Sequence, residues 1–170
     1  MPNWCNNKIT IKGDEVRIAN LWSSMKNENN EFCLMGAMPI PETEDESSYE
    51  WRITNWGTKW PMDVTSVDKD DTEILIFGFT AWSPPIELLE FISRNWEVDI
   101  EISFDEPGMD FAGVARFANG VGAISEGSIS EYMAGDVDEE DFDAWHEAWH
   151  EALERCLQFH KDVLNKEAVC

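Results

Sequence analysis

The chain has 170 residues, of which 35 are acidic and 12 are basic, so its formal net charge is −23. This length usually corresponds to one domain, and 43% apolar residues exclude disorder throughout. Such a negative molecule repels nucleic-acid phosphates, which excludes long nucleic acid as a direct ligand, and it attracts basic surfaces.

The cysteines and the apolar segments indicate where the protein resides. The four cysteines contain no C-x-x-C pair, which argues against a zinc ribbon or a dithiol redox site. No apolar run approaches the roughly 20 residues that a membrane span requires, and the N-terminus has the pattern of a strand rather than a signal peptide. We therefore expect a cytoplasmic protein with reduced thiols, no membrane contact and no cofactor.

The first part of the chain alternates short ordered elements with polar connections. Residues 8–12 alternate polar and apolar, which predicts a strand, and Asp14 can cap a helix that runs to about Asn27. Residues 32–40 are apolar but interrupted by glycine and proline, which predicts a buried loop or a short strand. Residues 42–50 are acidic without apolar periodicity, so we expect a solvated loop.

The following part is rich in strand signals. Residues 72–82 are almost continuously apolar, which predicts the central strand of the sheet. Ser83 is expected to cap the next helix, which has two prolines in its first turn and runs to about Asn95. An Asn-Gly pair predicts a hairpin between the last two of three antiparallel strands. These strands are expected at residues 98–104, 111–118 and 123–129.

The order of these elements predicts a fold class. A strand, a helix, a connection, a strand, a helix and three antiparallel strands correspond to a ferredoxin-like split βαβ domain of the α+β class. We expect one mostly antiparallel sheet with two helices on one face, extended by the C-terminal hairpin. This domain would occupy residues 1–135, and residues 136–170 would form an acidic C-terminal segment.

A long terminal helix is predicted at residues 138–166. Its apolar positions repeat with alternating spacings of three and four, as in a heptad seam. The seam would pack on the open face of the sheet or join two copies of the chain in a homodimer. Its members are Phe142, Trp145, Trp149, Ala152, Cys156, Phe159 and Val163.

Two tryptophan-rich stretches form the candidate ligand site. Residues 51–60 (WRITNWGTKW) contain three of the nine tryptophans, and residues 80–85 (TAWSPP) have the same mixed character. Aromatic faces stack on bases, basic side chains meet phosphate, and amides and hydroxyls supply hydrogen bonds, as a nucleotide-like ligand requires. The alternative is that these tryptophans fill an edge of the core. The candidate ligand-binding residues are Arg52, Asn55, Trp56, Thr58, Lys59, Thr80, Trp82 and Ser83.

A metal motif is present by pattern. His146-Glu147-Ala148-Trp149-His150 matches H-E-x-x-H, in which two histidines one helical turn apart bind zinc and the glutamate is the base. The match lies inside the repeat AWHEAWHEA, which generates the pattern by repetition. We therefore predict no metal ligands and no catalysis, and we keep a metal-dependent hydrolase as the third alternative.

The densest acidic stretch begins at residue 136. No lysine or arginine lies between Arg116 and Arg155, so this part of the chain carries uncompensated negative charge. It would either be a solvated helix start or an acidic surface that imitates nucleic-acid phosphates and occupies a basic groove of a partner protein. The candidate partner-binding residues are Asp136, Asp138, Glu139, Glu140, Asp141 and Asp143.

Four blocks of sequence carry a family resemblance. They are MPNWCNNKITI, WRITNWGTKW, FTAWSPP and EPGMDFAG, in this order along the chain. In them the chain resembles the Api92-like, YubB-type ferredoxin-like proteins of bacteriophages and conjugative plasmids. The resemblance covers about residues 1–130 and leaves the acidic C-terminal helix outside. It implies a ferredoxin-like fold and a mobile-element origin, and it implies no activity.

These observations lead to one expected function and two alternatives. We expect a non-enzymatic phage or plasmid protein that binds a basic host protein in the bacterial cytoplasm and inhibits it, as an anti-defence protein would. The first alternative is a protein that binds or sequesters a small nucleotide-like ligand at the tryptophan-rich stretches. The second is the metal-dependent hydrolase.

Overall fold

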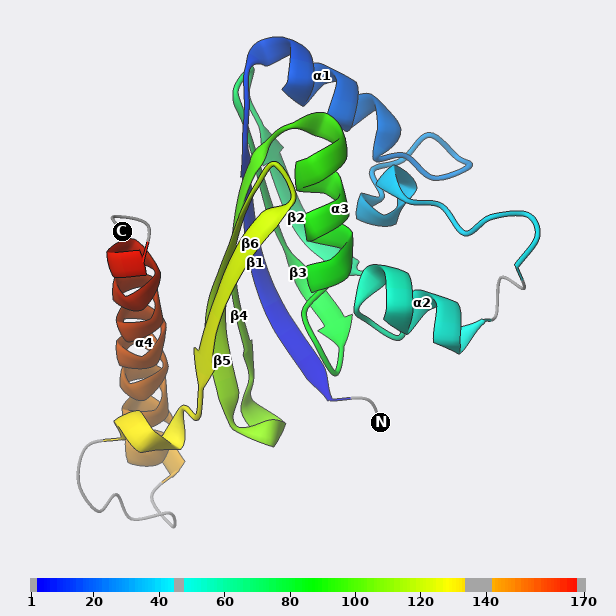
Figure 1. Cartoon of the computed structure of the whole chain (residues 1–170). Coiled ribbons are helices and arrows are strands. Elements are labelled where there is room, and N and C mark those ends of the chain that lie inside the picture. The colour runs from blue at the N-terminus through cyan, green and yellow to red at the C-terminus, as the bar shows by residue number, and fades with distance from the viewer. Residues whose placement is uncertain (1–2, 45–47, 134–141, 168–170) are drawn as a thin grey trace.

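The computed structural model describes residues 3–44, 48–133 and 142–167. Within these ranges, six strands form one sheet in the order β2-β3-β1-β4-β5-β6, and every neighbouring pair is antiparallel (Figure 1). The strands are β1 (Trp4–Lys12), β2 (Asp63–Lys69), β3 (Glu73–Ala81), β4 (Asp99–Glu106), β5 (Phe111–Ala118) and β6 (Val121–Gly127).

Helices cover the two faces of the sheet unequally. α1 (Glu15–Ser24), α2 (Tyr49–Trp56) and α3 (Ile86–Trp96) lie on one side, and α4 (Phe142–Glu167) lies on the other (Figure 1). Three short 3-10 helices are η1 (Leu34–Ala37), η2 (Pro107–Met109) and η3 (Ser130–Tyr132). Strands β1 to β4 with α1 and α3 form the predicted ferredoxin-like α+β arrangement, and β5 and β6 widen its sheet beyond β4.

The main core lies between the sheet and helices α1 to α3. Alternate residues of a strand point to the same face, and on this face Ile9, Ile11, Ile74 and Ile76 are fully buried. The helices present residues spaced three or four apart, as a helix packed on one side requires. Their fully buried members are Ile18, Leu21, Leu88, Leu89 and Ile92.

The first helix and the early strand follow the sequence pattern closely. Asp14 is the N-cap of α1, because its side chain accepts a hydrogen bond from the Arg17 backbone N–H at 2.9 Å. The helix ends at Ser24, before the Asn-rich turn. β1 is longer than the predicted residues 8–12, because Trp4 to Asn7 also pair with β3.

The connection between α1 and β3 contains more structure than the sequence pattern predicts. Residues 63–69 form β2, whose sequence DVTSVDK is mostly polar because it is an edge strand with few buried positions. α2 has eight residues and buries only Trp56, so it lacks an apolar stripe. Both elements therefore escape a search for hydrophobic periodicity.

Two predicted details of the β3–α3 region were wrong. β3 was predicted to be the central strand of the sheet. It is an interior strand next to the edge strand β2, and β1 and β4 occupy the middle. α3 begins at Ile86 after an N-cap at Pro85 that makes no side-chain hydrogen bond, so Ser83 does not cap the helix. The Ser83 hydroxyl instead donates to the Gly57 carbonyl at 2.5 Å. The Ser83 hydroxyl therefore bonds to a residue distant in the sequence instead of to the start of the helix that follows it.

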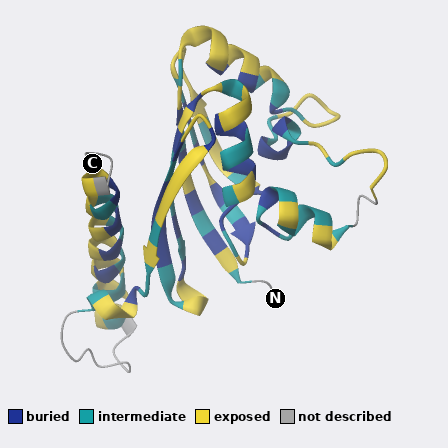
Figure 2. Cartoon of the chain, viewed as in Figure 1, coloured by how far each residue is buried: buried dark blue, intermediate teal, exposed yellow. Residues whose placement is uncertain are grey.

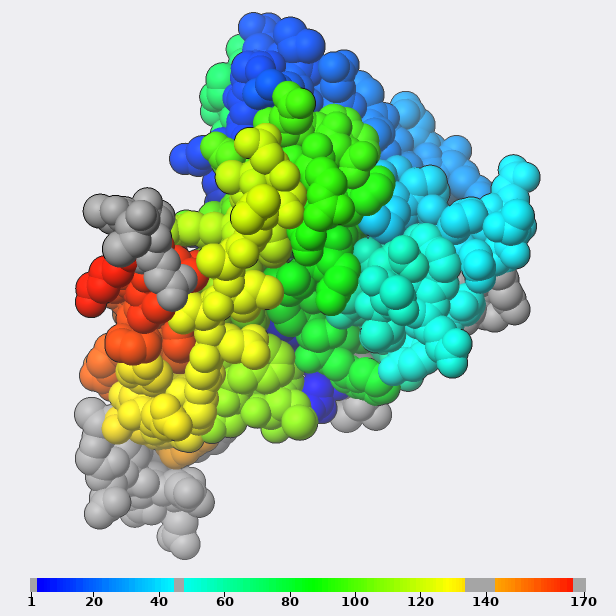
Figure 3. All heavy atoms as spheres, viewed as in Figure 1, coloured from blue at the N-terminus to red at the C-terminus, as the bar shows by residue number. Residues whose placement is uncertain are grey.

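α4 packs on the second face, over β5 and β6. Figure 2 shows its buried positions turned toward the sheet and its exposed positions turned away, and in Figure 3 the helix lies directly against the hairpin. The buried residues Ala152, Cys156, His160 and Leu164 are spaced by four. A row of residues spaced by four is a ridge with which a helix packs on a single surface. Phe159, a member of the predicted heptad seam, lies outside this row and is 50% exposed.

The apolar side of α4 is thus occupied within the same chain rather than left open for a second copy. Ala112 of β5 and Ile129 join it in a small second core. In the part of the chain that the structure describes, no helix has both the length and the apolar character of a membrane span.

A matched pair of isoleucines tests this assignment of faces. Ile9 is fully buried in β1, and Ile124 is 48% exposed in β6. We expect Ile9→Ala to lower the free energy of unfolding by about 2–5 kcal/mol, and Ile124→Ala to change it by less than about 0.5 kcal/mol. Denaturant unfolding followed by circular dichroism measures both, and equal effects would contradict the arrangement.

His160 predicts how the packing of α4 depends on pH. Burial against the sheet lowers the pKa of this histidine, with Glu126 acting in the opposite direction, and its Nδ1 lies 2.8 Å from the Ser125 hydroxyl. The unfolded chain therefore takes up this proton first, so stability is fully present above the ordinary histidine pKa and is lost as pH falls below it.

We expect the stability advantage of the parent over His160→Asn to shrink between about pH 7 and pH 5. The comparison with the variant removes the titration of the many carboxylates that the two proteins share. An advantage that stays constant over this range would contradict the role given to His160.

Candidate functional site

The two tryptophan-rich stretches lie together at one end of the sheet. α2 and the turn after it carry residues 51–60, and the end of β3 leads into residues 80–85. The Thr58 hydroxyl donates to the Ala81 carbonyl at 3.1 Å, and the Ser83 hydroxyl donates to the Gly57 carbonyl. The structure therefore brings together two stretches that are separated by some twenty residues of chain.

Asn7 of β1 joins the same network from the N-terminal block. Its side-chain amide donates to the Thr80 hydroxyl at 2.8 Å and to the Cys5 carbonyl at 2.9 Å. The Thr80 hydroxyl donates in turn to the Ser83 carbonyl at 2.8 Å. Burial raises the pKa of the Cys5 thiol far above its usual value, and the fully buried side chain packs in the main core.

Four of the predicted ligand-binding residues are buried or half-buried and form hydrogen bonds within the protein. Trp56 is 3% exposed and its indole N–H donates to the Met38 carbonyl at 2.9 Å, while Thr58 and Thr80 are fully buried. Asn55 is half-buried and donates to the carbonyl of Trp51 at 2.8 Å. A bound molecule could reach these groups only after rearrangement of α2 and β3.

Arg52 and Ser83 lie between the interior and the surface. The Arg52 guanidinium is 6.0 Å from the centre of the Trp56 ring, within the range of a cation–π contact. Ser83 is half-buried and holds the turn after β3. Lys59 is half-buried as well, so Trp82 is the predicted residue whose side chain is exposed.

Three exposed aromatic residues surround Lys59 and a fourth, Trp4, lies beside them; we call these five residues the aromatic cluster. The Lys59 Nζ lies 4.3 Å from the ring centre of Trp82, 4.8 Å from that of Trp60 and 5.4 Å from that of Tyr49. Trp4 extends the cluster, with its ring centre 6.5 Å from that of Trp60. The exposed fractions are 45% for Trp4 and Tyr49, 43% for Trp82 and 36% for Trp60.

Trp82 enters the cluster from an uncommon backbone conformation. Its φ of 74° lies in the left-handed region, which costs a non-glycine residue roughly 1–2 kcal/mol. Its backbone N–H donates to the Asn3 carbonyl at 3.0 Å, so the pairing of β1 and β3 continues one residue past the strand. The fold therefore maintains this conformation at a cost, while leaving the indole at the surface.

Trp4, Tyr49 and Trp60 were not among the predicted site residues, although Trp60 ends the predicted stretch 51–60. The register of β1 against β3 places Trp4 opposite Ala81, next to Trp82. A strand starting at Trp4 rather than at Lys8, paired antiparallel with residues 73–81, would have revealed this proximity. Tyr49 reaches Trp82 only because α2 folds beside the end of β3, with the two ring centres 6.3 Å apart.

The arrangement favours binding of cations and of protein surfaces. An aromatic face attracts an ammonium or guanidinium group, and Lys59 already occupies such a position in the free protein. Exposed tryptophan and tyrosine that lie together in a patch commonly mark an interaction surface, and both residue types are enriched among the side chains that dominate binding energy.

The other predicted sites are placed as follows. The rings of His146 and His150 lie edge to face on α4 with centres 4.4 Å apart. Among residues 3–44, 48–133 and 142–167, no three His, Cys, Asp or Glu side chains are arranged to hold a metal ion.

Of the predicted acidic partner-binding residues, Asp143 is exposed in the first turn of α4. The remaining acidic candidates, Asp136, Asp138, Glu139, Glu140 and Asp141, lie outside the described residues.

The EPGMDFAG block forms the turn between β4 and β5. The Glu106 carboxylate accepts hydrogen bonds from the backbone N–H groups of Gly108 and Met109. Asp110 accepts from the Ser130 backbone N–H at 2.8 Å and from the Ser128 hydroxyl at 2.5 Å. This block therefore joins β4 to β5 and anchors the chain that leaves β6.

The sheet order and the helix positions define the class of protein, a ferredoxin-like α+β domain with an additional helix on its second face. The family model described as the ferredoxin-like domain in Api92-like protein matches residues 59–154, which is more than half of the chain. The chain belongs to this family. The matched range ends within α4, beyond the point at which the sequence resemblance was expected to stop.

A solved structure supports the same fold. The crystal structure of the protein api92 from Yersinia pseudotuberculosis superposes with a TM-score of 0.53 and 11% sequence identity, covering 81% of this chain and 100% of that one. At this identity the likeness concerns the fold alone. A search of curated proteins gave no significant match.

Two tryptophans separate structural from surface roles at this site. Trp56→Ala removes a buried ring and a buried hydrogen bond, so we expect it to lower the free energy of unfolding by about 3–5 kcal/mol. Trp82→Ala removes an exposed ring, so we expect a change below about 1 kcal/mol. Thermal unfolding of the two variants beside the parent measures the difference, and similar losses would contradict the assignment.

Proposed function

We propose that the protein is a non-catalytic binding protein of a phage or plasmid, which engages a basic protein of the bacterial host in its cytoplasm and inhibits it. The observation that carries this proposal is the aromatic cluster, in which three exposed rings surround the ammonium group of Lys59 and the ring of Trp4 lies beside them. Such rings anchor protein interfaces because they bury a large area with few rotatable bonds.

The partner is expected to be basic for two independent reasons. The net charge of −23 attracts a positive surface and accelerates its association. The faces of the cluster also favour a cationic side chain, because Lys59 lies within cation–π distance of three of them. An arginine or lysine of the partner would compete with Lys59 for these faces.

The acidic stretch from residue 136 contributes to the proposal through its charge. It would steer a basic partner over a Debye length of roughly 8 Å at physiological salt, whereas the aromatic cluster would hold the docked complex. Steering groups mainly change association rates, and buried anchors mainly change dissociation rates. The acidic stretch would therefore contribute mainly to the association rate, and the aromatic cluster mainly to the dissociation rate.

The small-ligand alternative uses the same stretches and predicts the opposite response to one substitution. Lys59→Met keeps the length of the side chain and removes its charge. A basic partner should bind this variant at least as tightly as the parent, because a competing cation has gone. A ligand that carries phosphate should bind it more weakly.

Site-specific crosslinking tests the proposed interface. We expect a photoreactive residue at position 82 to capture a basic host protein from lysate, and the same residue at Val121, which is 76% exposed in β6, not to capture it. With that partner purified, Trp82→Ala should weaken binding about tenfold or more. Phe159→Ala should have little effect, since Phe159 is 50% exposed on the distant α4.

Added salt should weaken association of both the parent and the variants. Circular dichroism and thermal unfolding control for the fold of each variant. Equal losses from Trp82→Ala and Phe159→Ala, or capture that is the same from positions 82 and 121, would remove the aromatic cluster from the proposed function.

A further inference from the structure

The second face of the sheet is only partly covered. α4 lies over β5 and β6 and leaves a cleft between itself and strands β3, β1 and β4. The cleft has a volume of about 430 Å³, within the range of small-molecule sites. Leu157 and Lys161 of α4 form one wall, and Lys8, Phe77 and Phe79 lie on the floor. The cleft shares no residue with the aromatic cluster.

The floor combines aromatic rings with a cation. Phe77 and Phe79 occupy alternate positions of β3, so both side chains point to this face. Phe77 is 37% exposed, and Lys8 lies directly opposite it in β1 with its Nζ 5.7 Å from the ring centre. A planar ring that lies on these phenylalanines would have an ammonium group at its edge.

Basic and acidic side chains are balanced on this face of an otherwise negative molecule, because its hollows are lined by five residues of each kind; the acidic ones are Asp99, Glu101, Asp105, Glu151 and Glu154. Five of the 12 basic residues line its hollows: Lys8, Lys12, Arg116, Arg155 and Lys161. The Glu101 carboxylate is shared by two of them, with Arg116 Nε at 2.8 Å and Lys161 Nζ at 3.4 Å. Within the described part of the chain, no carboxylate lies within 4.0 Å of the Lys8 ammonium.

The acidic groups around the cleft are few and mostly engaged. Asp105 lines it, but burial raises the pKa of this carboxyl and the Asn6 amide donates to it at 2.6 Å. At the outer rim, Glu151 pairs with Arg155 at 3.6 Å, and Glu154 lies beside them. The lining itself carries two lysines against one aspartate.

We propose that this cleft binds a small anionic ligand with a planar ring, of the nucleoside monophosphate class. The base would stack on Phe77 and Phe79, and the phosphate would be bound by Lys8 with Lys161 beside it. The Ser103 hydroxyl has no hydrogen-bond partner among the described residues and would be available to the ligand. This site is independent of the proposed protein interface.

The overall charge selects for a small ligand. A mononucleotide would experience mainly the charges within roughly 8 Å, the Debye length at physiological salt. A longer strand would extend over the negative surface and would be repelled by it. The local excess of lysine therefore favours a compact anion over a polymeric one.

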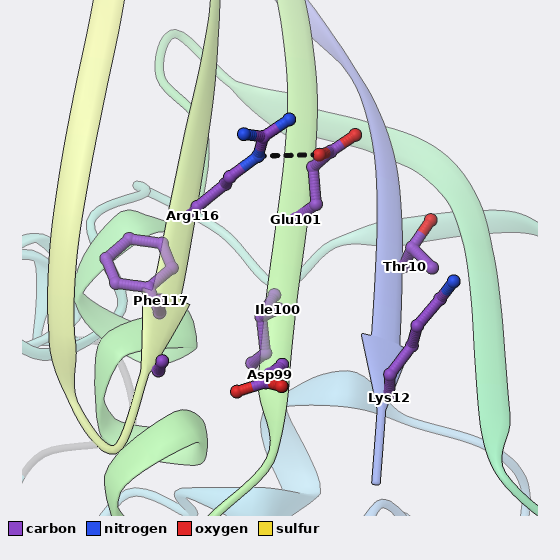
Figure 4. A pocket seen from close by; sticks show the side chains of 8 residues that line it. Thr10, Lys12, Asp99, Ile100, Glu101, Arg116 and Phe117 are labelled. Atoms are coloured by element: carbon purple, nitrogen blue, oxygen red, sulfur yellow. Dashed lines mark hydrogen bonds and ion pairs between the residues drawn. The ribbon is translucent and has the colours of Figure 1, made fainter. Parts of the chain in front are cut away.

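A neighbouring hollow on the same face is less suited to an anion. It has a volume of about 460 Å³ and is lined by Thr10, Lys12, Glu101 and Arg116 (Figure 4). There the Arg116 guanidinium points to the Glu101 carboxylate, and Lys12 pairs with Glu73 at 3.1 Å. A phosphate would have to displace a carboxylate, which is not required at Lys8.

Titration calorimetry with the four ribonucleoside monophosphates tests the proposal, with adenosine and inorganic phosphate as separate arms. We expect Lys8→Gln to weaken nucleotide binding about tenfold and to leave nucleoside binding unchanged. Phe77→Leu keeps an apolar floor without a ring, so it should weaken nucleotide and nucleoside alike by at least about fivefold. Lys69→Gln is the control, because it makes the same charge change on the exposed surface of β2.

Four outcomes would overturn the proposal. The first is the absence of binding to any of the four nucleotides at millimolar concentration. The second is phosphate binding as tightly as the nucleotides, which would indicate an anion site without base recognition. The third is an equal effect of Lys69→Gln and Lys8→Gln, which would indicate diffuse attraction. The fourth is affinity that rises with the length of an oligonucleotide, which would indicate a site for single-stranded nucleic acid.

Discussion

The buried side-chain amide of Asn7 is the contact on which the arrangement of the aromatic cluster depends. Asn7 is 4% exposed in β1, and an unsatisfied polar group in such a place costs about 1–3 kcal/mol. The amide is satisfied by Thr80, whose hydroxyl holds the Ser83 carbonyl, and Ser83 in turn holds Gly57. The turn after β3 and the turn after α2 are therefore fixed relative to β1. This series of hydrogen bonds joins the segments that carry the three rings around Lys59 and the ring of Trp4 beside them.

The ferredoxin-like fold could be predicted because its main elements bury enough surface to leave a periodic pattern. β4 alternates buried and half-buried or exposed residues along its whole length, and α3 begins directly after two prolines. The missed elements, β2 and α2, are held by neighbours rather than by their own apolar stripe. α4 was predicted as a helix, but the choice between a heptad seam and a ladder spaced by four depends on the surface it meets. That surface, on β5 and β6, is a product of the folded sheet.

The two tryptophan-rich stretches lie together in the structure, but the exposed residues there are mostly not the predicted ones. Trp56 and Trp82 lie in similar sequence surroundings, yet one is buried and the other is at the surface. Trp56 lies in the main core with its N–H on the Met38 carbonyl, whereas Trp82 follows β3 at a φ of 74°, and no local pattern encodes either placement. Trp4 and Tyr49 join the site only through long-range pairing. The net charge of the whole chain also does not reveal that two lysines line one cleft. They do so because the placement of α4 sets Lys161 across the cleft from Lys8.

The irregular, charged edge strand has a consequence for assembly. β2 carries a bulge between Val64 and Ser66 and presents Asp63, Asp68 and Lys69 along its length. A bulge disturbs the ladder of free N–H and C=O groups, and charges oppose the approach of a second strand. This border of the sheet is thus a poor template for strand addition, whether by another copy or by an extended peptide. The protein is therefore protected at this edge against edge-to-edge aggregation.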